Sequence, residues 1–127
     1  MLRDAVIETS KTWGDQPYWR KLSFPRTPLW NTQVLAAMFK LDGSDYPGDA
    51  EMLLTYLLGR QGIANATTDM FCSEMIAATC MMVGLLQEVH PPNFYAPRDF
   101  SSEPNATLPL VPAATLATEL KVVLPPD

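Results

Sequence analysis

Proline placement limits the fold of this chain more than any other feature, because the 12 prolines are spread unevenly over 127 residues. After the pair Pro91-Pro92, prolines recur at short intervals, at Pro97, Pro104, Pro109 and Pro112. Proline has no backbone N–H and clashes with the preceding helical turn, so this region can form only short extended pieces. Helices are therefore expected upstream of His90.

The segment that begins at Thr27-Pro28 is predicted to be the first helix. A hydroxyl residue is favourable at the N-cap, and proline is tolerated at the first helical position because its missing N–H would have no helical partner there. Apolar residues follow at helical spacing and end before Gly43, namely Trp30, Val34, Ala37, Met38 and Leu41. This stripe is expected to face a sheet. Strands are predicted upstream at residues 5–9 and 18–22.

Two further helices are predicted before the prolines. Asp49 is expected to cap a short helix ending before Gly59, and a polar loop follows. The third helix is predicted from about Phe71 to about Leu86, with one face made of Cys72, Met75, Ile76, Thr79, Met82, Val83 and Leu86. Residues 117–124 fit a last strand, although residues 116–120 fit a helical turn equally well. The order of elements indicates an α+β class, with helices packed on a small antiparallel sheet.

Composition excludes several kinds of function. With 47% apolar and 18% charged residues the chain is expected to be globular, and no run of eighteen apolar residues predicts a membrane span. Net charge is −5 and the nine basic residues are scattered, which argues against nucleic acid as a partner. An acid in the first apolar stretch argues against a signal peptide, and an intracellular location is favoured. The glycosylation-like triplets at Asn65 and Asn105 are short enough to arise by chance.

Cys72 and Cys80 lie on the predicted third helix, so their Cα atoms should be about 12 Å apart at about 1.5 Å per residue. A disulfide or a redox pair is excluded at that distance. Together with one histidine they make no ligand set, so neither a metal nor a cofactor is expected. Cys72 begins the helix, where unpaired N–H groups and the helix dipole stabilise a thiolate. Cys80 is expected to be a small packed side chain.

The residues around Cys72 form a longer motif. It reads Phe71-Cys72-Ser73-Glu74-Met75-Ile76-Ala77-Ala78, followed by Val83-Gly84-Leu85-Leu86 and then by Asn93-Phe94-Tyr95-Ala96-Pro97-Arg98-Asp99-Phe100. This series resembles the nucleophile helix and following loop of the permuted papain-like cysteine amidases and peptidases, the YiiX-like relatives of NlpC-type peptidases and lecithin retinol acyltransferase. The resemblance covers roughly the whole chain, but only the cysteine helix is diagnostic.

That resemblance implies a single, incomplete papain-like domain over residues 1–127. Its reaction would be amide, thioester or ester hydrolysis, or acyl transfer, through an acyl-Cys72 intermediate on a peptide, amide or acyl substrate. The backbone N–H groups of Cys72 and Ser73 would bind the oxyanion. Glu74 is expected to cap or pack in the first helical turn rather than to transfer protons.

The chain departs from this family at the catalytic base. The family's histidine precedes the cysteine, on a strand upstream of the one predicted at residues 5–9, whereas the single histidine here, His90, follows the helix and is expected at the surface. Glu8 lies on the strand that resembles the one orienting the imidazole. It is either that orienting carboxylate or a solvated acid on an edge strand.

Without a base the isolated chain is expected to be nearly inert, because acid–base catalysis contributes about 10²- to 10⁴-fold. Three explanations stay open. The chain is part of a longer enzyme, or a partner chain completes the sheet and supplies the histidine. In the third, the chain descends from an enzyme, has lost its activity and serves as a structural subunit. Two function classes therefore remain, a cysteine hydrolase component and an interaction protein in a larger assembly.

Overall fold

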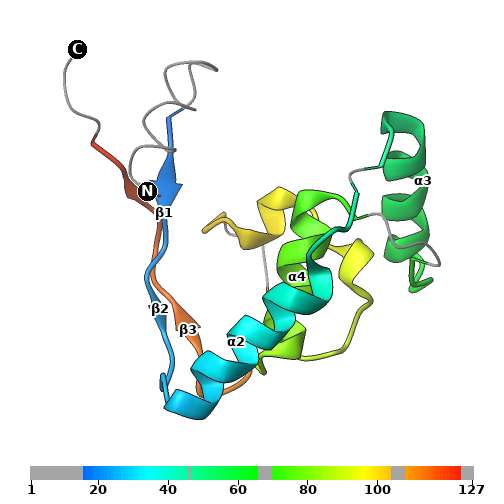
Figure 1. The fold of residues 1–127 in the computed structure, drawn as a ribbon. Helices are drawn as coiled ribbons and strands as arrows, with labels where there is room; N and C mark the ends of the chain where they lie inside the picture. The colour runs from blue at the N-terminus through cyan, green and yellow to red at the C-terminus, as the bar shows by residue number, and fades with distance from the viewer. Residues whose placement is uncertain (1–15, 46, 66–69, 104–107, 124–127) are drawn as a thin grey trace.

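The computed structural model describes residues 16–45, 47–65, 70–103 and 108–123. Along the chain these form β1 (Tyr18–Trp19), β2 (Leu22–Ser23), α2 (Pro28–Leu41), α3 (Asp49–Arg60), α4 (Cys72–Met82), the 3₁₀ turns η1 (Pro92–Phe94) and η2 (Pro97–Phe100), β3 (Thr115–Leu116) and β4 (Leu120–Lys121). A long two-stranded ribbon stands on one side and the helices on the other (Figure 1). The predicted α+β class is confirmed at this level. The strand predicted at residues 5–9, which carries Glu8, lies outside the described residues. No described helix is long and apolar enough to cross a membrane.

The ribbon contains a bulge that the sequence pattern did not predict. β1 pairs antiparallel with β4 and β2 with β3, with Trp19 opposite Leu120 and Leu22 opposite Leu116. Between these pairs the first strand has two residues, 20 and 21, and the second has three, 117 to 119. One extra residue on one strand is a β-bulge. The strand predicted at residues 18–22 is therefore split in two, and the helical turn considered for residues 116–120 is instead extended chain.

Arg20 lies at this bulge and ties the ribbon to the rest of the molecule. Its guanidinium donates hydrogen bonds to the backbone oxygens of Ala117 (2.7 Å), Phe100 (3.0 Å), Ser101 (3.0 Å) and Leu116 (3.3 Å). A lone two-stranded ribbon is marginally stable in water. Arg20 offsets that weakness, because its side chain extends from the first strand and binds the backbone of the second strand and of the end of η2.

Helix α2 begins and ends as predicted, but its apolar stripe has a different neighbour. Thr27 Oγ1 accepts a hydrogen bond from the Trp30 N–H (3.1 Å), Pro28 is the first helical residue, and Gly43 follows the helix with φ +85°. The stripe packs mainly on α4, and Met38 is 60% exposed. The expectation that it faces a sheet is wrong because the two-stranded ribbon is too narrow to cover a 14-residue helix.

Helix α3 differs from its prediction at both ends. Gly48 is the N-cap and Asp49 the first helical residue, so the carboxylate lies in the first turn, where it favours the positive end of the helix dipole. The helix continues through Gly59 to Arg60. Gly59 is buried because the backbone of η1 at Asn93 and Phe94 packs directly against it. Gly59 is therefore explained by the close approach of the η1 backbone, and not by the end of the helix.

Helix α4 begins at Cys72 as predicted but ends at Met82, earlier than expected. Gly84 has φ +75° and reverses the chain, so that the N–H groups of Leu85 and Leu86 both donate to the Cys80 oxygen (2.8 and 3.2 Å). The buried side also differs from the predicted apolar face, since it comprises Ser73, Glu74, Ala77 and Ala78, whereas Ile76 is 51% exposed. Most of these side chains are small, which lets η1 and α2 approach the helix closely.

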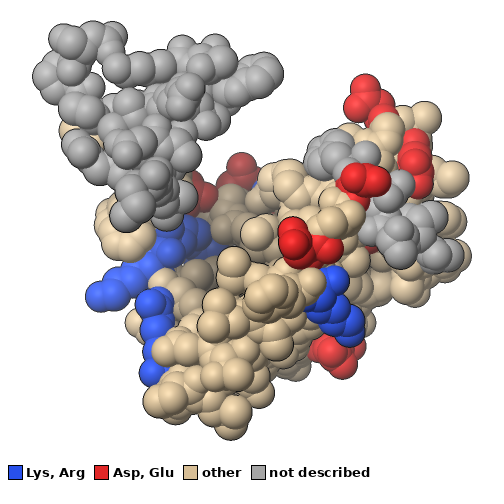
Figure 2. All heavy atoms as spheres, in the orientation of Figure 1, with Lys and Arg blue, Asp and Glu red and all other residues tan. Residues whose placement is uncertain are grey.

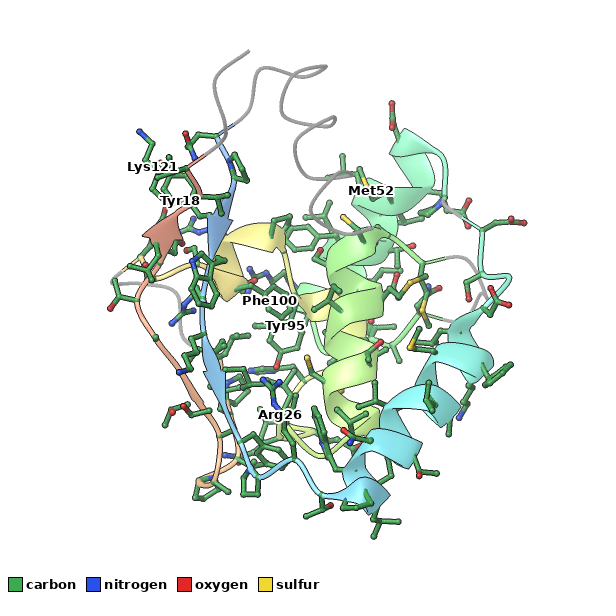
Figure 3. All side chains as sticks on the ribbon, turned by 60° about the vertical axis from the view of Figure 1, so that its left-hand side comes forward. Tyr18, Arg26, Met52, Tyr95, Phe100 and Lys121 are labelled. Atoms are coloured by element: carbon green, nitrogen blue, oxygen red, sulfur yellow. The ribbon has the colours of Figure 1, made fainter. Side chains whose placement is uncertain are left out.

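The core consists of two adjoining clusters. One joins α2 to the segment after α4 through Ala37, Val83, Leu85 and Ala114. The other centres on Tyr95, which packs with Ala77 and Leu86. Figure 3 shows Tyr95 and Phe100 between the ribbon and α4. Burial raises the pKa of Tyr95, Asp99 adds to the rise and Arg60 opposes it; its buried hydroxyl has no hydrogen-bond partner among the described residues.

Candidate functional site

Cys72 is the first residue of α4, is exposed, and opens onto a groove. The groove has a volume of about 320 Å³, and its walls are Met52, Leu53 and Tyr56 of α3, Phe71, Cys72 and Ser73 at the start of α4, and Ala96 and Pro97 beside η2. Met52 projects from α3 (Figure 3). Nearly all of the wall is carbon. The structure thus brings Cys72 and Ser73 to one apolar groove between two helices.

The first turn of α4 is held by Glu74. One oxygen of its buried carboxylate accepts a hydrogen bond from the Phe71 N–H (3.2 Å), and the other accepts one from Asn65 Nδ2 (2.8 Å). The first helical bond runs from the Met75 N–H to the Phe71 oxygen (3.0 Å), so the N–H groups of Cys72 and Ser73 precede the helical ladder. Glu74 therefore caps the helix, as the sequence predicted.

A buried polar network continues from Glu74 to η1. The Asn65 N–H donates to Asn93 Oδ1 (3.2 Å), and Asn93 Nδ2 donates to the backbone oxygens of Thr55 (2.7 Å) and Ile63 (2.9 Å). Asn93 is fully buried. Sequence reasoning missed Asn65 and Asn93 as positioning residues. An asparagine in a polar loop or beside two prolines is typical of a turn, where its side chain bonds the local backbone. The one available signal was that Asn93 opens the last part of the Cys72 motif.

The wall opposite α4 is fixed by charged residues that lie outside the groove lining. Arg60 NH2 pairs with Asp99 Oδ2 (3.2 Å), and Arg60 Nε donates to the Tyr56 hydroxyl (2.9 Å). The same Asp99 oxygen accepts the Ala96 N–H (2.8 Å). These bonds tie the Ala96-Pro97 wall to α3. Arg60 and Asp99 therefore pair with each other, and neither is part of the groove lining.

The pKa of Glu74 is raised from its ordinary value of 4.5 by burial, while the hydrogen bonds from Asn65 and Phe71 lower it in part. The native chain consequently binds this proton more tightly than the unfolded chain. That contribution to stability is complete below about pH 4.5 and is lost as the pH rises through the native pKa. In urea unfolding at pH 4 to 7, Glu74→Gln should gain stability relative to the unsubstituted chain as the pH rises. A Glu74→Gln difference that does not vary with pH would contradict the assignment.

Cys80 behaves as the sequence predicted. It is half-buried, it packs against both core clusters, and burial raises the pKa of its thiol. Both cysteines are free. The two thiols of this chain therefore differ in access to solvent, and Cys72 is the more exposed of the two.

No histidine of this chain lies in the groove wall. His90 is exposed, as expected, and its ring stacks on Phe94 with a centroid distance of 3.8 Å. Glu8 lies outside the described residues, so its predicted role stays a prediction. Among the described ranges no group of three or more His, Cys, Asp or Glu side chains gathers to hold a metal ion. In the described part of the chain the geometry supplies a thiol, helix-start N–H groups and an apolar groove, with no histidine in its wall.

Comparison with protein-family models, curated proteins and solved structures finds no match for this chain. The likeness to permuted papain-like hydrolases therefore rests on the motif around Cys72, and function has to be argued from the geometry of the site.

Proposed function

We propose that this chain carries the nucleophile of a papain-like cysteine hydrolase, a thiol amidase, peptidase or acyltransferase that works through an acyl-Cys72 intermediate. The observation that carries the proposal is the exposure of Cys72 at the start of α4, open to a groove of about 320 Å³. The sequence motif that continues from Cys72 to Phe100 supports it, because both ends of that motif contribute walls to the same groove.

The chemistry would proceed in two steps. The thiolate sulfur of Cys72 attacks a carbonyl carbon, a C–S bond forms, and the bond to the leaving oxygen, sulfur or nitrogen breaks as that atom takes its electron pair and a proton. Water then attacks the acyl-Cys72 carbonyl, loses its proton to a base, and releases the acid and the thiol. The N–H groups of Cys72 and Ser73 would stabilise the oxyanion in both steps.

The proton carrier is assigned to an imidazole from outside this sequence, supplied by a longer form of the chain or by a partner that adds a strand to the ribbon. Glu8 is the residue that would orient it, as the family resemblance implies. Until such a group is present, acylation should be observable but turnover slow, because release of the acyl group needs a base.

The test is acylation of the purified chain by p-nitrophenyl acetate, with the acetylated cysteine located by tandem mass spectrometry of the tryptic peptide 61–98, which contains both cysteines. Native chain should acetylate Cys72 about 100-fold faster than the same chain in urea, the lower end of what one oxyanion donor contributes. Added imidazole should accelerate loss of the acetyl group. Selective modification of Cys72 would not be enough, because exposure alone favours it over Cys80.

Two variants complete this test. Cys72→Ala should abolish the fast acetylation of the native chain, and Cys80→Ala should leave its rate unchanged. Equal acylation rates in the native and unfolded chain would overturn the proposal.

A second function, binding within a larger assembly, is favoured by one observation. The outer face of α2 carries Leu35, Met38 and the 81% exposed Phe39, and Figure 2 shows few charged side chains over this face. Contiguous exposed apolar surface of this kind marks interaction sites. In that function Cys72 is idle, so the acylation test separates the two.

A further inference from the structure

We infer that the groove beside Cys72 binds an unbranched acyl chain of medium length, which makes a fatty acyl ester or thioester the class of substrate. This inference rests on the proposed role of Cys72 as nucleophile. It goes further because it selects one class among the peptide, amide and acyl substrates that the motif leaves open.

Among the residues that the structure describes, the groove wall has no charged residue and almost no polar surface. In this wall Ser73 Oγ donates to the Tyr95 oxygen (2.9 Å), and the Tyr56 hydroxyl oxygen accepts from Arg60 (2.9 Å). Arg60 and Asp99 pair with each other outside the lining. Away from the N–H groups at the start of α4, a charged or polar group entering this groove would lose water and gain few partners, which costs several kcal/mol.

An acyl chain satisfies these walls better than a peptide does. Every peptide residue brings a backbone N–H and C=O that require partners when buried, and the groove offers few. A hydrocarbon chain brings none and gains free energy from each methylene removed from water. The thioester carbonyl at its end would lie at Cys72, beside the N–H groups at the helix start.

The volume limits the length. If a methylene group takes ~30 Å³, as a water does in the liquid, this open groove of about 320 Å³ holds at most roughly ten such groups. Shorter chains would leave part of the apolar wall in water, and longer chains would extend into solvent.

The experiment measures alkylation of Cys72 by N-alkylmaleimides from ethyl to octyl, with glutathione as the reference thiol. The rate at Cys72, divided by that of glutathione, should rise by up to about fourfold for each methylene that enters the groove. Leu53→Asp should abolish this dependence on length because Leu53 lines the groove. Leu54→Asp is the matched control, since Leu54 is equally exposed on the same helix (58% against 57%) but outside the wall.

Three outcomes decide the proposal. A length dependence that Leu53→Asp removes and Leu54→Asp keeps supports the acyl groove. A rate that does not vary with length, or a dependence that both variants abolish, overturns it. Maleimide addition needs neither a leaving group nor an oxyanion site, so this assay reports on the groove even if acylation by p-nitrophenyl acetate fails, and a negative result here leaves the nucleophile assignment standing.

Discussion

Asn93→Ala should lower the free energy of unfolding by about 2 to 4 kcal/mol, because it removes the three hydrogen bonds of a fully buried side chain, at about 0.5 to 1.5 kcal/mol each. The Asn93 amide donates to the Thr55 and Ile63 oxygens and accepts from the Asn65 N–H. These groups belong to α3 and to the loop after it. The loss would therefore loosen the joint between α3 and η1 as well as remove three hydrogen bonds.

Urea unfolding followed by circular dichroism checks this prediction. The matched control is Asn31→Ala on the exposed side of α2, which should change stability by no more than about 0.5 kcal/mol. An unchanged slope of free energy against urea would show that the effect lies in the native state. A loss below about 1 kcal/mol would mean that water replaces the amide, against the burial seen here.

Gly59→Ala should destabilise the fold by about 2 to 4 kcal/mol, which is the cost of forcing an extra group into a closed contact. A Cβ atom at this position would lie 2.6 Å from the Phe94 nitrogen and nearer still to the Asn93 carbonyl. Both are backbone atoms, so no side chain can rotate away. Alanine gains about 1 kcal/mol of helix propensity over glycine, and the steric cost exceeds that gain.

Gly48→Ala is the control for this substitution. A Cβ atom there meets nothing within 4 Å, and Gly48 precedes the same helix. Its effect should stay below about 1 kcal/mol, the usual scale of an N-cap change. If the two variants unfold at the same urea concentration, η1 does not pack on α3 as described.

Both predictions have a consequence for the groove. The α3–η1 contact holds the Met52, Leu53 and Tyr56 wall, and Asn93 connects through Asn65 to Glu74 at the start of α4. Substitutions at Asn93 and Gly59 share these partners, so their effects on stability should not add.

Local patterns were read correctly where a few neighbouring residues decide the outcome. The start of α2 follows from Thr27-Pro28, the start of α4 lies at Cys72, and the capping role of Glu74 follows from its place three residues after Phe71. Each depends on hydrogen bonds within a single helical turn, and the residue types that make these bonds can be recognised in the sequence.

Other predictions were wrong because distant parts of the chain decide those features. The strand at residues 18–22 breaks at a bulge set by the length of residues 117–119. Helix α4 buries its small residues, and Ile76 stays exposed, because α2 and η1 approach on that side. Helical spacing shows which residues share one face of a helix. It does not show which face a neighbouring helix or turn will cover.

The sequence alone therefore determined where helices are possible and which cysteine begins a helix. It also determined that His90 is the single histidine of this sequence. Tertiary packing decided that Cys72 opens onto a groove, that carbon forms its walls, and that Asn93 and Asn65 hold its edge. The physical reason is the sequence separation of the residues involved. Caps and proline breaks act over one helical turn, whereas this groove forms where segments some fifteen or more residues apart meet, and burial, which no local pattern encodes, selects their contacts.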